Sequence, residues 1–278
     1  MSNRMIFRAL ALVAVLCALW AGAACAQGAP DANKGLATLQ EAADKGDAQA
    51  QFRLGGMYAL GQGVPQDGVK ALALLQKAAD QGYAPAQYNM GVFYERGQGM
   101  PKDAAKAVEF YQKAADQGYP PAQCNMGVLY EHGQGVPQDV AKAAQFYQKA
   151  ADQGYVLAQY NLGMIYAQGE GVPQDLAKAA AFFQKAADQG YVQAQYSLGA
   201  MYLRGRGVPL DQAKAAEFLQ KAADQGDTRA KAALGAMYAL GAGVSKDVDK
   251  GCGLLRAALA KGVSGVRTQE VFDRYCPK

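Results

Sequence analysis

The chain repeats itself at an interval of 36 residues, and no other feature restricts its fold as strongly. The segment from Tyr155 to Gly190 matches near-copies of itself on both sides, and the interval never slips. A fixed period of roughly 20–50 residues is typical of repeat architectures, in which each unit packs on its neighbours. The period therefore predicts a solenoid or an array. The glycines that close successive copies are Gly46, Gly82, Gly118, Gly154, Gly190, Gly226 and Gly262.

Each copy carries two apolar stripes with helical spacing. In the central copy, Ala158, Leu162 and Tyr166 lie on one side of a first helix. Ala179 and Phe183 recur with the same period in a second helix. Because both stripes are one-sided, each copy is predicted to be a pair of packed helices.

The segment between the two stripes, residues 169–175, predicts a tight junction between the helices. Its two glycines end the first helix and permit a positive φ. Pro173 cannot continue a helix, and Asp175 is placed to cap the next one through its carboxylate. Gly163 and the recurring alanine pairs would let the two helix backbones approach closely.

Together these positions read A-x-x-x-L-G-x-x-Y-x-x-G-x-G-V-x-x-D-x-x-K-A-x-x-x-x-x-K-A-A-x-x-G, a pattern that resembles the Sel-one-like repeat (SLR). That repeat is a relative of the tetratricopeptide repeat, whose ordinary unit has about 34 residues and a shorter turn. The resemblance covers roughly residues 31–262. It implies an all-α fold, a right-handed α/α superhelical solenoid of 36-residue helix-turn-helix repeats. It also implies a protein-interaction scaffold rather than an enzyme.

The repeat register divides the chain into three parts. Residues 1–26 are predicted to be a signal peptide, residues 27–262 the SLR solenoid, and residues 263–278 a C-terminal cap. The solenoid begins with half a repeat, residues 31–46, and its last repeat is degenerate, as terminal repeats usually are. The six full repeats are 47–82, 83–118, 119–154, 155–190, 191–226 and 227–262.

Three adjacent features indicate a secretory signal. Arg4 and Arg8 supply a positive start, residues 9–20 form a short apolar run, and residues 24–26 form an Ala-x-Ala cleavage site. The mature chain would begin at Gln27 and be periplasmic or secreted. Removing the signal lowers the formal net charge from +4 to +2, because the segment holds two arginines and no acid.

An alternative makes Cys25 the lipid-bearing residue of a lipoprotein, although Gly22 stands where such signals usually have leucine. No second apolar run of spanning length follows, so an integral membrane protein is not expected. No basic stripe interleaved with aromatic residues appears, which argues against nucleic acid as a partner. A monomer is expected.

Cysteine usage fits an oxidising compartment. Cys252 lies early in the last second helix, and the tail after Gly262 is able to bring Cys276 beside it. A disulfide there would be worth roughly 3 kcal/mol by loop-closure entropy. The alternative is two unrelated buried thiols.

Cys124 stands where other copies have tyrosine and is interpreted as a small buried hydrophobe.

Catalytic and metal sites find little support in the sequence. The single histidine, His132, aligns with leucine, arginine and glutamine in other copies, which indicates a surface position at a helix end. No cysteine or histidine pair has metal-ligand spacing, and no cofactor is expected. Some proteins of the SLR family have been described as β-lactamases, but no Ser-x-x-Lys occurs after residue 26.

Asparagines recur just before the apolar-Gly pair of the first helix, where helix propensity does not favour them. In related tetratricopeptide modules this position faces the inner groove, so the resemblance implies that these asparagines hold a bound peptide. Tyrosines beside them are suited to an adaptable interface. Inheritance by duplication, without function, is the alternative. The predicted partner-binding residues are Asn89, Asn125, Asn161, Tyr88, Tyr160, Tyr196, Arg96 and Arg204, over an apolar floor of Val92, Val128 and Met164 and with His132 at the rim.

The sequence thus predicts an exported, non-enzymatic scaffold that binds a protein or an extended peptide on its concave face. A second hypothesis is a cell-wall glycan or peptidoglycan binder that uses the same tyrosines and asparagines. A β-lactamase-like hydrolase is the third.

Overall fold

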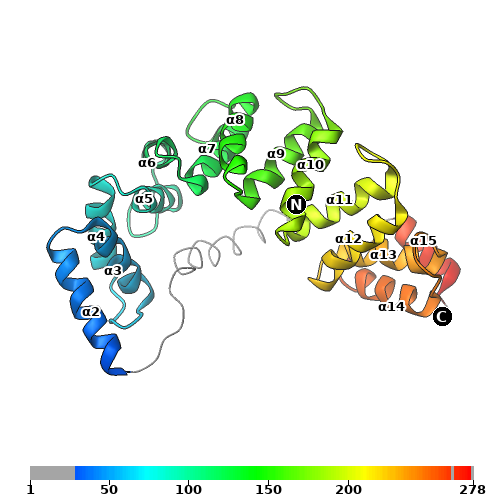
Figure 1. Ribbon diagram of the computed structural model, residues 1–278, viewed down its shortest axis with the longest axis horizontal. Coiled ribbons are helices and arrows are strands. Elements are labelled where there is room, and N and C mark those ends of the chain that lie inside the picture. The colour runs from blue at the N-terminus through cyan, green and yellow to red at the C-terminus, as the bar shows by residue number, and fades with distance from the viewer. Residues whose placement is uncertain (1–28, 264–265, 277–278) are drawn as a thin grey trace. The chain divides into compact units, whose positions relative to one another are not determined.

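The computed structural model describes residues 29–263 and 266–276. In that part of the chain there are fourteen helices and no strand (Figure 1). The predicted signal peptide, residues 1–26, lies outside the described residues. The chain divides into two compact units, of which the first ends at Gln117 and the second begins at Gly118.

Unit 1 contains five helices, and unit 2 contains nine, within the described residues. The helices of unit 1 are α2 (Ala29–Asp44), α3 (Ala48–Leu60), α4 (Gly68–Asp80), α5 (Ala84–Arg96) and α6 (Ala104–Asp116). Those of unit 2 are α7 (Pro120–His132), α8 (Val140–Asp152), α9 (Val156–Gln168), α10 (Leu176–Asp188), α11 (Val192–Arg204), α12 (Gln212–Asp224), α13 (Thr228–Leu240), α14 (Val248–Leu259) and α15 (Val266–Tyr275).

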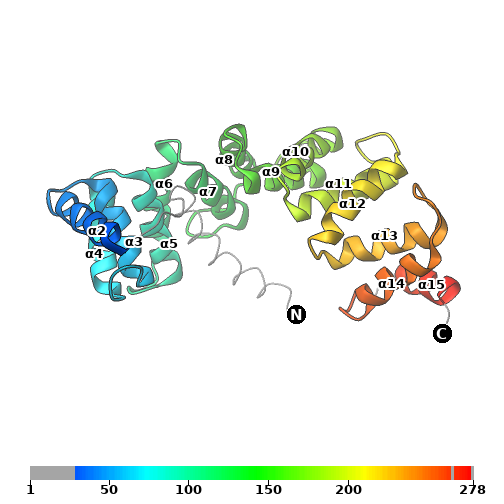
Figure 2. The same cartoon turned by 60° about the horizontal axis from the view of Figure 1, so that its bottom comes forward.

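Two kinds of helix alternate along the chain. We call the first helix of each repeat the A helix (α3, α5, α7, α9, α11 and α13) and the second the B helix (α4, α6, α8, α10, α12 and α14). The helix α2 precedes the first full repeat and falls at a B position, in the predicted half repeat. Within each repeat the A and B helices pack side by side (Figures 1 and 2). The predicted all-α solenoid of helix pairs is confirmed.

The junction between A and B helices has the conformation that its sequence requires. Gly169 ends α9 with φ 75°, and Gly171 has φ 71°, both in the left-handed region that glycine tolerates. The carboxylate of Asp175 then accepts a hydrogen bond from the Lys178 backbone N–H at 2.9 Å and caps α10.

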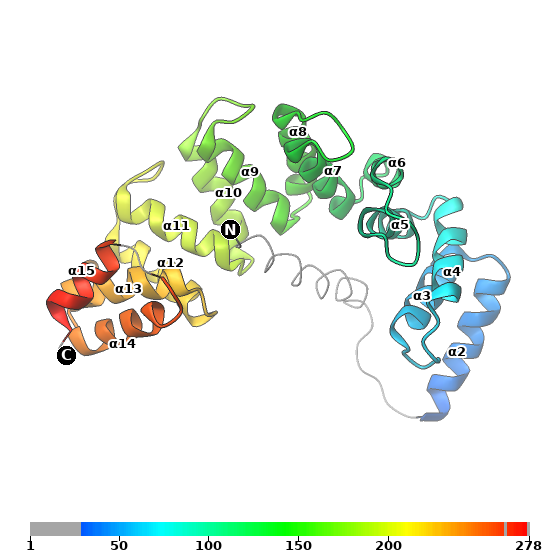
Figure 3. The same cartoon turned by 180° about the vertical axis from the view of Figure 1, so that it is seen from behind.

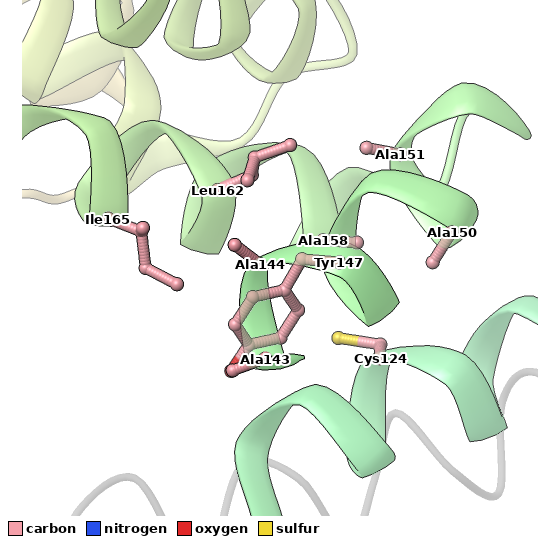
Figure 4. Packing of buried hydrophobic residues seen from close by; sticks show 9 residues of the cluster. All are labelled: Cys124, Ala143, Ala144, Tyr147, Ala150, Ala151, Ala158, Leu162 and Ile165. Atoms are coloured by element: carbon pink, nitrogen blue, oxygen red, sulfur yellow. The ribbon is translucent and has the colours of Figure 1, made fainter. Parts of the chain in front are cut away.

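Close helix contact depends on one glycine in each A helix. A Cβ atom on Gly163 would lie 2.7 Å from Cε1 of Phe183 in the B helix, and one on Gly127 would lie 2.5 Å from Cε1 of Tyr147. Distances this short mean that the facing aromatic ring occupies the space of the missing side chain. Tyr147 itself lies at the centre of a core formed by three helices of unit 2 (Figure 4). The buried residues of this core are Cys124, Ala143, Ala144, Tyr147, Ala150, Ala151, Ala158, Leu162 and Ile165.

A ladder of buried glutamines links consecutive repeats. Gln159, which is 4% exposed, donates from Nε2 to the Ala151 carbonyl of α8 at 3.3 Å. Its Oε1 accepts from Nε2 of Gln189 at 2.8 Å, and Gln189 also donates to the Gly154 carbonyl at 3.0 Å. One side chain therefore connects three helices. The same glutamine pairs are Gln51–Gln81, Gln87–Gln117, Gln123–Gln153 and Gln195–Gln225.

The C-terminal end of unit 2 is covered by α15, which packs on α13 and α14 (Figure 3). Cys252 of α14 and Cys276 form a disulfide, in agreement with the predicted pairing. Val271 is buried in the same cluster, with Phe272 packed against it. The predicted cap region, residues 263–278, is described except for residues 264–265 and 277–278.

Candidate functional site

The A helices of unit 2 each present one side to solvent. On α9 this side consists of Leu157, Asn161, Met164 and Gln168, which are half-buried or exposed. The spacing of these four residues places them on one face of a helix. We call the equivalent positions together the A face of unit 2. Its other members are Pro121, Asn125, Val128 and His132 of α7, Gln193, Ser197, Ala200 and Arg204 of α11, and Arg229, Ala233, Ala236 and Leu240 of α13.

Arg229 of this face and two tyrosines at its edge connect three successive A helices. The guanidinium of Arg229 lies 4.3 Å from the ring centroid of Tyr196, a cation–π contact. The ring of Tyr160 contacts that of Tyr191 edge-on, with centroids 5.1 Å apart. Burial raises the pKa of Tyr160, while the nearby Ser197 and the charge of Arg229 oppose that rise. Tyr160 and Tyr196 are half-buried.

An ion pair holds Arg229 in place. Its Nη2 lies 2.7 Å from Oδ2 of Asp227, whose side chain is 9% exposed while that of Arg229 is 50% exposed. Asp227 also caps α13 by accepting from the backbone N–H groups of Arg229 and Ala230. Burial raises the pKa of Asp227, but the hydrogen bonds from Arg229 and Ala230 outweigh it and lower the pKa overall. The Asp227 carboxylate is therefore occupied by Arg229 and by two backbone N–H groups, whereas the Arg229 side chain remains half in solvent.

Asn161, the central residue of the predicted asparagine ladder, lies on the A face but is half-buried. Its Nδ2 lies 4.0 Å from the sulfur of the buried Cys124 in α7. The Tyr147 hydroxyl donates to Oε2 of Glu131 at 2.6 Å. Burial, followed by the charge of Glu131, raises the pKa of the Cys124 thiol to about 12. This cluster is an internal polar network, so Asn161 has less to offer a partner than its sequence position implied.

The predicted binding residues of unit 1 differ in accessibility. Asn89 and Tyr88 are each 8% exposed, and the Tyr88 ring lies 5.6 Å from that of Tyr111. Side chains so deeply buried leave little surface for a partner. Arg96, at the end of α5, is half-buried. In unit 2, Asn125 is half-buried and Arg204 is exposed at the end of α11.

Two recurring features escaped the sequence reading. The glutamine ladder is one. The other is a stack in which Tyr166 lies parallel to Phe182 at 5.9 Å, with Lys178 and Lys185 over the two rings at 5.3 Å and 5.2 Å. The residues of both features recur at the period of 36 residues, and this recurrence is the sequence signal that could have identified them. Lys178 also pairs with Asp175, with an Nζ–Oδ2 distance of 3.3 Å.

Among the residues that the structure describes, no cluster of three or more histidine, cysteine or acidic side chains is arranged to bind a metal ion. Over the same residues, no helix has both the length and the apolarity to cross a bilayer. His132 is exposed at the end of α7, as its variable alignment predicted.

The family model of the Sel1 repeat matches six consecutive segments, residues 48–83, 84–119, 120–155, 156–191, 192–227 and 228–263. Among solved structures, a protective antigen of uropathogenic Escherichia coli that displays an SLR fold is 38% identical with a TM-score of 0.80; the match covers 85% of this chain and 50% of that chain. A Sel1 repeat protein from Oxalobacter formigenes is 39% identical with a TM-score of 0.72; the match covers 84% of this chain and 67% of that chain. The chain thus spans half the length of the first of these relatives. A comparison with curated protein sequences gives no match.

Proposed function

The chain belongs to the Sel1 repeat family, and on this premise we propose that it is an exported scaffold whose A face of unit 2 holds another protein or an extended peptide. Proteins of this family are in general non-catalytic and mediate protein–protein interaction. The protein takes part in no chemical step of its own in this proposal.

The junction of α9, α11 and α13 is the observation that carries the proposal. Tyr160, Tyr196 and Arg229 contact residues of neighbouring repeats and remain partly open to solvent. Tyrosine and arginine are enriched among residues that dominate interface energies, because they combine a large apolar surface with polar groups. Since these side chains are already held in place, ordering them on binding costs little entropy.

Apolar side chains complete the surface. Leu157 of α9 and Leu240 of α13 are 37% and 42% exposed, which is unusual for leucine in a packed array. They belong to the same face as Arg204 and Asn125. A surface with exposed leucine, half-buried tyrosine at its edge and peripheral arginine has the composition of a protein-binding site rather than of a solvated helix face.

Export is supported by the N-terminal pattern and by the disulfide. Arg4, Arg8 and the apolar run 9–20 have the form of a secretory signal. The Cys252–Cys276 disulfide is stable in the oxidising compartments that exported proteins reach. In this proposal the mature protein begins at Gln27 and acts as a monomer in the periplasm or outside the cell.

Site-specific photo-crosslinking in envelope extracts tests the proposal. A benzoylphenylalanine at Gln193, on the A face, should form an adduct with a protein partner. The same group at Ala181, which is exposed on the B helix α10, serves as the matched control. Adducts that form equally at both positions, or at Ala181 alone, would show that the A face is not the binding surface.

A co-sedimentation experiment distinguishes the glycan hypothesis from protein binding. Purified cell-wall sacculi incubated with the mature protein should leave it in the supernatant if the partner is a protein. Co-sedimentation that is lost on replacing both Tyr160 and Tyr196 by alanine would support glycan binding instead.

A further inference from the structure

The helix α2 is a B helix without an A helix of its own. It packs on α3, the A helix of the following repeat (Figure 1). It is also the first helix in the part of the chain that the structure describes, so no A helix precedes it there. We call the side of α2 that an A helix would cover its open side. The residues of this side, which share one helix face by their spacing, are Gly35, Thr38, Leu39 and Ala42.

The positions of the open side are covered in every other repeat. At the position of Leu39, the residues of the six B helices are at most 3% exposed. At the position of Ala42, all six have an alanine that is 0% exposed. Leu39 and Ala42 themselves are half-buried, and Gly35 is exposed. Among the described residues, the open side is therefore the one surface of this kind that no A helix covers.

The last repeat shows what such a surface packs against. The helix α14 has the same three residue types as α2 at these positions, Gly251, Leu255 and Ala258. Its A helix, α13, comes so close that a Cβ atom on Gly251 would lie 2.7 Å from the Gly235 carbonyl oxygen. A Cβ atom on Gly235 would lie 3.0 Å from Cγ of Leu255. On α2, by contrast, a Cβ atom on Gly35 would meet nothing within 4 Å.

From this match we infer that the open side of α2 binds a helix of another protein, and that this helix resembles α13. Its contact side carries a glycine opposite Leu39 and a small residue four positions later opposite Gly35, as Gly235 and Ala239 of α13 do for α14. In four B helices the position of Thr38 holds a phenylalanine stacked on a tyrosine of the A helix. Because threonine is smaller, the partner helix has room for a large side chain there.

The helix has to come from a different chain. In the proposed function the mature protein begins at Gln27, which leaves two residues before α2, too few for a helix. The inference rests on the proposed function for this start alone. A second copy has no spare A helix among its described residues, because each one packs on its own B helix and α15 covers the last pair.

Fluorescence anisotropy on the mature, disulfide-bonded protein tests the inference. The probe is a fluorescein-labelled peptide with the sequence of residues 227–247, which includes α13, its cap Asp227 and the junction that follows. The matched control is the same peptide with Gly235→Leu. An isolated helix of this length is marginal in water, so the probe should gain helical circular dichroism when it binds. The probe should bind saturably, and Gly235→Leu should weaken binding about tenfold, because a side chain at this position forces the two helices apart.

Two variants of the protein locate the binding on α2. Gly35→Leu should leave the fold intact, because a Cβ atom there meets nothing within 4 Å and leucine is favoured over glycine in a helix. It should weaken the probe about tenfold, because the new side chain fills the space that the partner helix needs. Ala37→Leu is the control. Ala37 is exposed at the position that Ala181 has in α10, and this variant should bind the probe as the wild type does. Thermal unfolding checks that both variants are folded.

The inference is overturned if the probe does not bind, if the two peptides bind equally, or if Gly35→Leu binds the probe as well as Ala37→Leu does. Light scattering without the probe examines the other occupant. A dimer that Gly35→Leu converts to a monomer would show that a second copy, and not another protein, fills the open side.

The photo-crosslinking at Gln193 keeps this inference separate from the proposed function, because it reports on the A face of unit 2. If an adduct forms at Gln193 and the probe does not bind, the inference alone fails. If the probe binds at α2 and no adduct forms at Gln193, the proposed function fails and the inference stands.

Discussion

Replacement of Gly163 by alanine tests the close approach of α9 and α10. A Cβ atom at this position would lie 2.7 Å from Cε1 of Phe183 and 3.3 Å from the Ala179 carbonyl oxygen. Overpacking typically costs about 1–3 kcal/mol, whereas alanine is favoured over glycine in a helix interior by about 1 kcal/mol. The expected net result is a loss of up to about 2 kcal/mol.

Gly253→Ala is the matched control, because a Cβ atom on Gly253 in α14 meets nothing within 4 Å. This variant should be more stable than the wild type by roughly 0.5–1 kcal/mol. Urea unfolding followed by circular dichroism compares the midpoints of the two variants at equal slope. If Gly163→Ala gains as much stability as Gly253→Ala, the helices are not in contact at Gly163 and the packing argument is wrong.

A second change shows whether the Phe183 ring is the cause. Phe183→Ala alone should cost roughly 3–5 kcal/mol, because it removes a buried aromatic side chain. In the double variant the alanine at position 163 no longer meets the ring. The loss of stability in the double variant should therefore be smaller than the sum of the losses in the two single variants. Strict additivity would mean that the two residues do not interact.

The remaining predictions concern the ladder, the buried thiol and the cap. Gln159→Leu should lower stability by about 1–3 kcal/mol, because it leaves buried carbonyl and amide groups unpaired; Gln193→Leu should not, and urea unfolding distinguishes them. Burial raises the pKa of Cys124 from 9.0 to about 12. The stability that this shift contributes is complete below about pH 9 and is lost as the pH rises towards 12. The fall in urea midpoint between about pH 8 and pH 10.5 should therefore be smaller in Cys124→Ala than in the wild type. Cys276→Ser should lower the melting temperature, with a cost of about 3 kcal/mol for a closed loop of this length, and a reducing agent should then have no further effect; an unchanged melting temperature would show that the disulfide does not hold α15.

Local sequence determined most of the repeat. The positive φ of Gly169, the cap supplied by Asp175 and the apolar spacing of Ala158 and Leu162 are properties of segments shorter than one repeat. Each depends on backbone conformation or on one helical turn, so neighbouring residues suffice to specify it. Their recurrence then predicted the solenoid and, through the family pattern, the Sel1 repeat.

The burial of the side chains at the candidate site was predicted less well than the helices. A side chain on a partly buried helix face can point either into the core or into solvent. Of the predicted binding residues, Tyr160 and Tyr196 are half-buried and Arg204 is exposed, whereas Tyr88 and Asn89 are buried. Arg229 was not singled out, since its aligned positions in other repeats hold glutamine, leucine or proline. A charge that occurs in one copy only leaves no periodic signal.

The direction of Asn161 illustrates what the tertiary structure decided. Its amide turns inward to the buried Cys124 of α7, with Nδ2 at 4.0 Å from the sulfur. One repeat later Tyr160 stands in place of Cys124, and Ser197 stands in place of asparagine. The sequence by itself determined that a polar residue occupies this position in each of these repeats. Only packing decided which group this residue contacts, because that group comes from another repeat. The distance between the two residues follows from how the helices stack rather than from spacing along the chain.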